Sequence, residues 1–365
     1  MKKLLAFLMA LSLIFSLSIS LVSCNTPDDD ECDHVDKDND NKCDECKEKV
    51  KGIHKHRDRD KDNYCDNCDA LIRITMGTGG AAGTYYAFGG ALGTQIKNST
   101  GINVNVVTSD GSKANILGID TGDYQLGTVQ SDVMAYAWAG SRSFESEGKI
   151  DSFRVIGGLY AEAVQLVTTN ANIKSVADLA GKKVSIGAAG SGVYFNAVDV
   201  LAAAGLDLDD IDPQYQSFAD SADALKDGKI DAAFIVAGAP TPAITELFQT
   251  NSAYLVPIDG AVATKLFTDC EYYTEYTIPA NTYKGQTEEV KTVTVKATLI
   301  VSASASEEDV YNITKAIFEN IEAITTAHAK GAELSLENAT SGMTAPFHKG
   351  AAKYFAEKGI TVDAQ

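Results

Sequence analysis

The chain has 365 residues, 45% of them hydrophobic and 22% charged, which is the composition of a globular protein with an ample core. It carries 31 basic and 50 acidic side chains, so its formal net charge is −19. This acidic balance argues against a nucleic-acid-binding protein, because that function needs a basic surface.

The N-terminus has the pattern of an export signal. Lys2 and Lys3 precede an apolar run, residues 4–22. A short basic region before an apolar stretch is typical of a signal peptide, here residues 1–23, and not of a spanning helix in the mature protein. Leu21-Val-Ser-Cys24 resembles the bacterial lipobox, which predicts lipidation of Cys24 and an extracytoplasmic lipoprotein held at the cell membrane by its acyl chains. The alternative is a retained membrane anchor with a chance cysteine.

Residues 24–70 contain an internal repeat whose first copy starts at Cys32 and whose second starts at His54 with the same spacing. Each copy ends in a C-x-x-C pair and offers four nitrogen or sulfur donors, a set that suits tetrahedral zinc. Each copy also has D-x-D-x-D, which opens a calcium loop, with Asn41 or Asn63 where an EF-hand has glycine. The candidate zinc ligands are Cys32, His34, Cys43, Cys46, His54, His56, Cys65 and Cys68. The alternative calcium ligands are Asp36, Asp38, Asp40, Asp58, Asp60 and Asp62.

Three interpretations of the repeats stay open, namely zinc, calcium or both metals, and a disulfide-stapled or unstructured spacer. The twelfth position of the calcium loop is Lys47 in one copy and Asp69 in the other, so the bidentate glutamate of an EF-hand is missing. Exported cysteines often oxidise. Units of about 20 residues have too little core to fold without a metal or a staple. We expect residues 24–70 to be a lipid-anchored spacer before the main domain.

Residues 71–365 form the main domain, in which strands and helices alternate. The expected strands are 72–76, 103–108, 125–129, 153–160, 163–168, 183–186, 232–236, 254–257 and 290–302. The expected helices are 84–97, 112–120, 131–139, 176–179, 191–204, 219–227 and 307–328. Ser306 with Asp309 is a capping-box signal for the last helix. Such alternation predicts an α/β architecture with largely parallel sheets.

Two glycine-rich turns each join a strand to a helix. The first contains Gly77, Gly79, Gly80 and Gly83, and the second spans Gly187 to Gly192. Glycine lets a ligand approach backbone N–H groups, and the start of a helix offers unpaired donors with a partial positive charge. Each turn therefore suits an anion. Because ligands favour the carboxyl ends of strands in such sheets, the two turns predict a cleft between two lobes.

Several segments of the main domain resemble the TAXI-type solute-binding proteins of TRAP transporters, and they occur in the same order. The resemblance covers nearly the whole main domain and leaves the N-terminal repeats outside it. The segments are Thr78-Gly-Gly-Ala-Ala-Gly-Thr-Tyr-Tyr86, Ile119 to Asp132, Val176 to Gly192, Leu225 to Pro240, Ile278 to Gln286, Leu336-Glu-Asn-Ala339 and Phe347 to Phe355.

The resemblance implies a two-lobed periplasmic-binding-protein fold of type II and a protein that is not an enzyme. Lobe 1 would hold residues 71–160 and 257–365, lobe 2 would hold residues 161–256, and crossings near Tyr160 and Pro257 would act as hinges. The ligand implied is a small carboxylate, either a glutamate-like amino acid or a dicarboxylate. The closed form would deliver it to the membrane permease subunits of an ion-gradient-driven TRAP transporter. No cofactor is expected for ligand binding.

The candidate ligand-binding residues lie in the two turns, at other strand ends and at the first crossing. They are Gly79, Gly80, Thr84, Tyr85, Ser112, Gln130, Ser131, Glu162, Ser191, Gly192 and Gly238. Ser112 and Ser131 could instead cap helices, the glycines could serve turn geometry alone, and Glu162 could be a solvated hinge residue or meet a ligand ammonium. The main domain has only Arg73, Arg142 and Arg154, none in a glycine turn. We therefore expect backbone N–H groups and hydroxyls to hold the carboxylate.

Two other functions compete with this one. An exported α/β hydrolase needs a nucleophile and a histidine, but Gly190-Ser191-Gly192 is not G-x-S-x-G, and His328 and His348 lie in neither turn. The glycines of the first turn also miss the dinucleotide-binding pattern G-x-G-x-x-G by one residue. No G-K-[ST] follows them, so the phosphate-binding loop of ATPases is not indicated. A ligand-sensing binding lipoprotein without a permease is the other alternative. The ligand's identity and the role of the lone Cys270 cannot be read from the sequence.

Overall fold

The computed structural model describes residues 59, 63, 64, 71–189 and 191–365. Chain contacts divide the protein into two units, Met1–Ala70 and Leu71–Gln365, and the fold below is that of the second. The predicted lipidation site Cys24 and all the predicted zinc and calcium ligands lie outside the described residues. Asn63 has a φ of 74°, a left-handed conformation that asparagine adopts in many turns and that identifies no metal.

A mixed sheet runs through the described part of the main domain in the order β2-β1-β3-β10-β4-β7-β5-β6, with β8 paired to β4 and β9 to β10. The pairs β1–β2, β1–β3, β5–β6 and β5–β7 are parallel, and the remaining pairs are antiparallel. The strands are β1 (Arg73–Gly77), β2 (Asn103–Val107), β3 (Leu126–Gln130), β4 (Phe153–Thr168), β5 (Lys183–Ser185), β6 (Asp212–Gln214), β7 (Ala232–Ala237), β8 (Tyr254–Val256), β9 (Thr274–Ile278) and β10 (Val290–Ser302).

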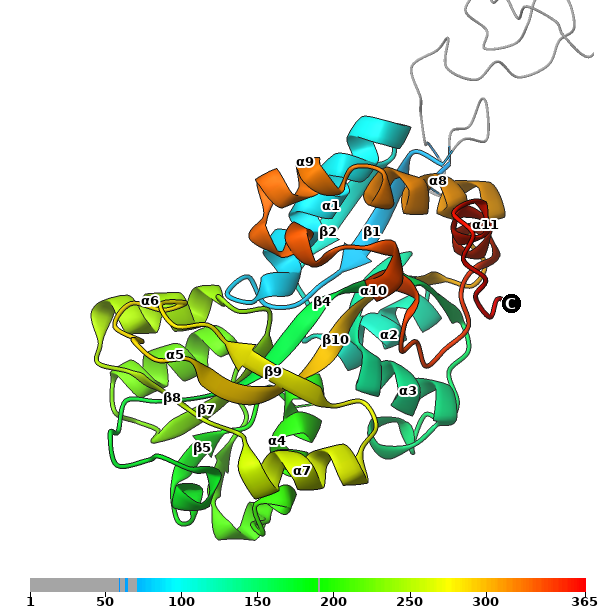
Figure 1. Cartoon of the computed structure of the whole chain (residues 1–365). Helices are drawn as coiled ribbons and strands as arrows, with labels where there is room; N and C mark the ends of the chain where they lie inside the picture. Colours follow the sequence, from blue (N-terminus) through cyan, green and yellow to red (C-terminus); the bar gives the residue numbers. More distant parts are fainter. Residues whose placement is uncertain (1–58, 60–62, 65–70, 190) are drawn as a thin grey trace, which may run out of the picture. The chain divides into compact units, whose positions relative to one another are not determined.

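Two long strands connect the two lobes (Figure 1). The sequence predicted a break near residue 161, but β4 continues through it, because β10 pairs with β4 on both sides of that point. The first half of β4 contributes Phe153 and Ile156 to the core of lobe 1, and the second half contributes Val164 and Leu166 to that of lobe 2. The crossing is therefore a continuous antiparallel ribbon, with register shifts between Lys296 and Ile300.

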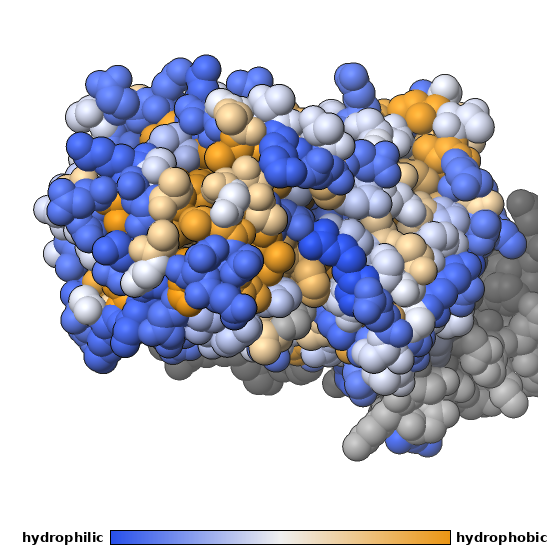
Figure 2. All heavy atoms as spheres, turned by 90° about the horizontal axis from the view of Figure 1, so that it is seen from below, coloured by the Kyte–Doolittle hydropathy of each residue, from blue (hydrophilic) through white to orange (hydrophobic). Residues whose placement is uncertain are grey.

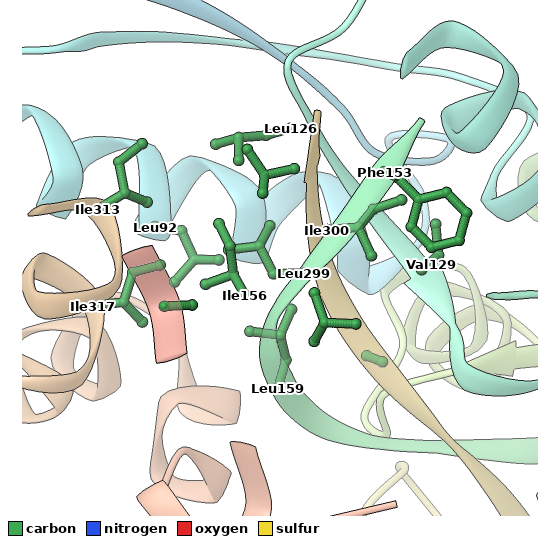
Figure 3. Close-up of a cluster of buried hydrophobic side chains, with 14 of the residues drawn as sticks. Leu92, Leu126, Val129, Phe153, Ile156, Leu159, Leu299, Ile300, Ile313 and Ile317 are labelled. Carbon is green, nitrogen blue, oxygen red and sulfur yellow. The ribbon is translucent and has the colours of Figure 1, made fainter. Parts of the chain in front are cut away.

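Lobe 1 packs helices around one large core. Figure 3 shows Leu92 of α1 and Ile313 and Ile317 of α8 gathered beside Ile156 of β4 and Leu299 of β10. The helices of this lobe are α1 (Thr84–Thr100), α2 (Ser112–Asp120), α3 (Ser131–Ala139), α8 (Glu307–Phe318), α9 (Ile321–Ala327), α10 (Leu336–Thr340) and α11 (Lys349–Glu357), with the short 3-10 turns η1 (Arg142–Phe144) and η4 (Ala329–Glu333).

Lobe 2 buries both faces of its sheet. Along β7, Ala232, Phe234 and Val236 belong to one core cluster, while Ala233 and Ile235 belong to another. Because successive side chains of a strand point to opposite faces, helices must cover the sheet on both sides, as parallel α/β sheets require. These are α4 (Gly192–Ala203), α5 (Phe218–Lys226), α6 (Pro242–Thr250) and α7 (Gly260–Asp269), with 3-10 turns η2 (Val176–Leu179) and η3 (Leu208–Asp210).

The chain returns to lobe 1 later than the expected boundary at residue 257. Ile258, Leu266 and Tyr273 pack in one core of lobe 2, and Ile278 packs in the other. The return takes place within β10, whose Val293 and Val295 still belong to lobe 2 and whose Ala297 to Val301 belong to lobe 1. Residues 258–295 therefore belong with lobe 2 because α7 and β9, which were not predicted, complete its layers.

The long helix expected over residues 307–328 is interrupted. Ser306 caps α8 as predicted, since its hydroxyl accepts the N–H of Asp309 at 3.0 Å. Asn320 then leaves the helical conformation, with φ −128° and ψ 32°, and its side chain donates to the carbonyl of Ala316 at 3.0 Å. Asparagine competes with helix hydrogen bonding in this way, which explains why the segment forms α8 and α9.

No helix in the described residues is both long and apolar enough to span a bilayer. The surface seen from below is largely polar, and apolar side chains gather over its left half, the side of lobe 2 in Figure 1 (Figure 2). Tyr215, Tyr254 and Phe267 of that lobe are among the exposed large hydrophobic side chains.

We expect Gly350→Ala to destabilise lobe 1 by about 1–3 kcal/mol, as overpacking does. Gly350 lies where α11 meets α8, and an added Cβ would come within 2.2 Å of the Glu307 carbonyl oxygen and 2.6 Å of the Tyr311 nitrogen. Both are backbone atoms, so helix α11 must shift. Urea unfolding measures the change. Gly90→Ala in α1 is the control, because its Cβ meets nothing within 4 Å and alanine favours the helix. Equal stability of the two variants would contradict the packing argument.

Candidate functional site

A cavity of about 610 Å³ lies between the two lobes. Its walls come from the segments that follow the carboxyl ends of β1, β2, β3, β5, β6 and β7, and from Glu162 on the crossing strand β4. Parallel strands end at the same edge of a sheet, so these segments meet there. The volume is that of an ordinary small-molecule pocket.

The first glycine turn forms one wall and leads into α1. Gly83 precedes α1 without any side-chain cap, so the first N–H groups of the helix are left for another partner. Thr84, the first helical residue, donates its hydroxyl to the carbonyl of Gly238 in lobe 2 at 2.8 Å. This turn therefore offers backbone donors to the cavity and also bonds the two lobes together.

The second glycine turn faces the first across the cavity. Ser191 caps α4, since its hydroxyl accepts the N–H of Tyr194 at 3.4 Å. Gly192 begins α4 in very tight contact with lobe 1: an added Cβ would lie 1.6 Å from Oε1 of Gln130. Only glycine fits this close approach between the lobes.

Glu162 is a buried acid at the crossing, 2% exposed, and accepts a hydrogen bond from the hydroxyl of Tyr85. Burial raises the pKa of Glu162 well above its usual range, against the opposing effect of the Tyr85 hydrogen bond. The charge of Asp132 raises that pKa further, and the charge of Lys330 lowers it. Burial therefore favours the neutral form of Glu162.

An ion pair between a buried lysine and a partly exposed glutamate supports the crossing. Lys330 of η4 is buried, bonds to Glu333 and has its Nζ 5.8 Å from the centre of the Tyr160 ring. The second carboxylate oxygen of Glu333 accepts the N–H of Ala161 at 2.8 Å. This pair ties the C-terminal part of lobe 1 to the residue before Glu162. Nothing local in the sequence indicates the contact between Glu333 and Ala161, because the two residues are 172 positions apart along the chain.

Most of the predicted ligand-binding residues line the cavity: Gly79, Gly80, Thr84, Tyr85, Ser112, Gln130, Glu162, Ser191 and Gly192. Ser112 also accepts the N–H of Gln130 at 3.1 Å. Ser131 and Gly238 are not on the wall. The hydroxyl of Ser131 accepts the N–H of Lys296 at 3.2 Å, and the carbonyl of Gly238 is taken by Thr84 and Thr241.

Some wall residues were not predicted, notably Gln216, Ser217 and Phe218. They follow β6 and lead into α5, which is the same strand-to-helix arrangement as the glycine turns. β6 has only three residues, Asp212–Gln214, and contains a proline, so no strand was expected there. Asp110 joins Glu162 as an acidic wall residue, and none of the described wall residues is lysine, arginine or histidine.

These features define a two-lobed α/β protein with a ligand-sized cavity at the crossing of the lobes. The chain belongs to the NMT1-like family, whose model matches residues 76–359. Its fold is α/β and two-lobed, as predicted.

The chain is also similar to solved binding proteins. One is the periplasmic aliphatic sulphonate binding protein SsuA from Escherichia coli, with 18% identity, 79% of this chain and 91% of that chain covered, and a TM-score of 0.42. Another is the alkanesulfonate-binding protein SsuA from Xanthomonas axonopodis pv. citri bound to MOPS. Its identity is 17%, 79% of this chain and 90% of that chain are covered, and the TM-score is 0.45. A third is an ancestral arginine-binding protein bound to arginine. Its identity is 18%, 72% of this chain and 97% of that chain are covered, and the TM-score is 0.45. Likeness at this level says nothing about the ligand of this chain.

Proposed function

We propose that the protein is an extracytoplasmic solute-binding protein that captures a small carboxylate between its lobes and delivers it to a membrane permease. The observation that carries the proposal is the cavity of about 610 Å³ enclosed by strand ends of both lobes, with Glu162 buried at the crossing. A ligand that touches both walls favours the closed form over the open form. Capture and release then follow from opening and closing about the β4–β10 ribbon.

The charges of the wall favour a glutamate-like amino acid over a dicarboxylate. The acidic groups Glu162 and Asp110 line the cavity without any described basic side chain on its wall. A dicarboxylate would bring two negative charges to such a wall, whereas the ammonium of an amino acid can pair with Glu162. The uncapped start of α1 offers N–H donors and a partial positive charge to the ligand carboxylate.

An enzymatic role has weaker support. Ser191 is engaged as the cap of α4, and the two histidines of the main domain are engaged elsewhere. His348 accepts the N–H of Gly350 and bonds to the carbonyl of Ala305, while His328 accepts the N–H of Lys330. No serine–histidine pair is assembled among the described residues, so the proposal assigns binding without chemistry.

The permease and the anchor are further parts of the proposal. The TAXI-like motifs of the main domain support a TRAP-type permease driven by an ion gradient. The lipobox-like segment that ends at Cys24 supports a lipid anchor outside the cytoplasmic membrane. We propose that residues 24–70 act as a spacer that zinc or calcium stabilises. Metal analysis of the full chain before and after chelation tests the spacer.

Two measurements test the binding function. Mass spectrometry under native conditions identifies any ligand that co-purifies with the full chain. Calorimetry then compares glutamate, glutamine, 2-oxoglutarate, succinate and glutarate. We expect glutamate or glutamine to bind more tightly than glutarate, which lacks the ammonium. Failure to bind any of these, together with turnover of an ester, would overturn the proposal.

A further inference from the structure

Next to the cavity, one side chain of lobe 2 bonds two side chains of lobe 1. Asn196 of α4 is fully buried and donates its amide N–H groups to Asp132 of α3 at 2.9 Å and to the hydroxyl of Tyr273 at 2.8 Å. Its amide oxygen accepts from Gln130 at 3.1 Å. Oδ2 of Asp132 accepts this bond, which fixes the orientation of the Asn196 amide. The amide of Gln130 is in turn fixed with its N–H groups toward Asn196.

A second contact continues this network across the lobes. Arg142 of η1 pairs with Asp199 of α4 through two hydrogen bonds, of 2.6 and 3.2 Å. Tyr273 donates its hydroxyl to Asp199 at 3.0 Å and so joins the two sets of contacts. Arg142 adopts a φ of 50°, which is uncommon outside glycine. Lobe 1 supplies Arg142, and lobe 2 supplies its partner Asp199, while Tyr136 of lobe 1 accepts a further hydrogen bond from Arg142 at 2.9 Å.

The closed arrangement also leaves polar atoms unsatisfied. Oε1 of Gln130 and Oδ1 of Asp132 are buried, and neither has a hydrogen-bond partner among the described residues. Burying an acceptor without a partner carries a desolvation penalty, which is larger for a charged acceptor. Separation of α3 from α4 would expose both oxygens to water. The contacts that join the lobes are therefore opposed by a desolvation penalty, centred on Asp132.

We propose that Asn196, Gln130, Asp132, Arg142 and Asp199 form a latch that holds the lobes together, and that closing it takes up a proton at Asp132. The proton removes the buried negative charge, whose desolvation opposes closure. This property concerns the lobes and not the ligand, so it goes beyond the proposed binding function.

The direction of the pH dependence follows from the surroundings of Asp132. Burial raises the pKa of Asp132 from 3.8 to about 6 in the closed form, hydrogen bonds from Val133 and Asn196 oppose the rise, and the charge of Asp199 adds to it. Other titratable or charged groups nearby are Glu162 on β4, Tyr136 on α3, Arg142 on η1, and Cys270, Tyr272 and Tyr273 before β9. Arg142 does not neutralise Asp132, because it is paired with Asp199.

The proton binds more tightly to the closed form than to the open form, where water solvates Asp132 and its pKa returns toward 3.8. The proton therefore stabilises the closed form fully below pH 3.8, and this stabilisation is lost as the pH rises through about 6. At the limit, the ratio of closed to open molecules changes on the order of 100-fold across this range.

Hydrogen–deuterium exchange on the full chain without ligand tests the latch. We expect the first turns of α4 to be better protected at pH 5 than at pH 8, after correction for intrinsic exchange, with a smaller radius of gyration by X-ray scattering at pH 5. Asp132→Asn, which is neutral and nearly isosteric, should be protected at both pH values. Asn196→Ala should lose protection at both. Thr314→Val in α8 removes a buried hydroxyl far from the latch and should follow the wild type.

A wild type with equal protection at pH 5 and pH 8 would overturn the proposal. So would an Asp132→Asn variant that keeps the wild-type pH dependence, and this outcome decides the matter even if Asn196→Ala does not fold. Because no ligand is present, the result is independent of whether the protein binds an amino acid.

Discussion

Glu162→Gln is expected to weaken binding of the glutamate-like ligand on the order of 100-fold, since truncating one member of a buried charge pair costs about 2–5 kcal/mol. The carboxyl of Glu162 is 2% exposed, so water cannot replace it against a ligand ammonium. Glutamine keeps the size of the side chain, which leaves the β4–β10 crossing intact. Calorimetry measures the affinity for the amino acid that binds the wild type.

The deaminated analogue of the ligand separates the charge effect from general damage to the cavity. A ligand without an ammonium, such as glutarate for glutamate, should lose much less affinity, because it has nothing to pair with Glu162. Tyr85→Phe is the companion variant. It removes the hydroxyl that donates to Glu162 and leaves the carboxyl group of Glu162 in place. If Glu162→Gln weakened both ligands equally, the pairing of Glu162 with an ammonium would be wrong.

The two buried carboxyl groups predict opposite effects of pH on affinity. Burial raises the pKa of Glu162, which must be ionised to meet an ammonium, so its contribution to binding grows as the pH rises. Asp132 favours closure when protonated, so its contribution falls as the pH rises through 6. The wild type should bind best at an intermediate pH, and Asp132→Asn should leave only the rise that is due to Glu162.

Gly192→Ala is the second large effect that we expect, with a loss of ligand affinity on the order of 10- to 100-fold. The new Cβ would lie 1.6 Å from Oε1 and 2.6 Å from Cδ of Gln130, and 3.0 Å from Cγ2 of Val133. The Gln130 amide could move aside only by giving up its bond to Asn196. The lobes are therefore expected to stay apart, and the closed form becomes rare.

Calorimetry and X-ray scattering measure this effect, with thermal unfolding as a check on each lobe. The unfolding temperature should change little, because alanine suits the first turn of α4 once the lobes have separated. Gly90→Ala is the matched control, since its Cβ meets nothing within 4 Å. A Gly192→Ala protein that closes and binds like Gly90→Ala would show that the contact with Gln130 does not limit closure.

The elements with strong local patterns were predicted closely. The bounds of α2, α3 and β10 match the sequence expectation, because Gly111 precedes α2, Gly140 follows α3, and a β-branched run spans β10. α6 was missed although Pro242 at its start and the apolar spacing of Ala243, Ile244 and Leu247 are helix signals. The return to lobe 1 was misplaced because an apolar pattern shows that a residue is buried but not in which core.

The cavity was predicted in outline because it obeys a local rule, that polar and glycine residues after strand ends meet at one edge of the sheet. The contacts that shape its chemistry do not follow any local rule. Lys330 and Glu333 reach the crossing from the C-terminal part of lobe 1, and Tyr273 meets Asn196 from a segment with no predicted element. Only the folded chain brings such distant residues together.

The β4–β10 ribbon restricts how this protein can change in evolution. Its two strands are bonded to each other through the crossing, with Phe153 to Ala163 of β4 paired along Thr294 to Ser302 of β10 apart from two register shifts. A single inserted residue in one strand would turn every following side chain of that strand to the opposite face and so disturb the core of a whole lobe. We therefore expect homologous chains to vary in amino acid here but to keep the length of both strands, with insertions confined to the outer loops.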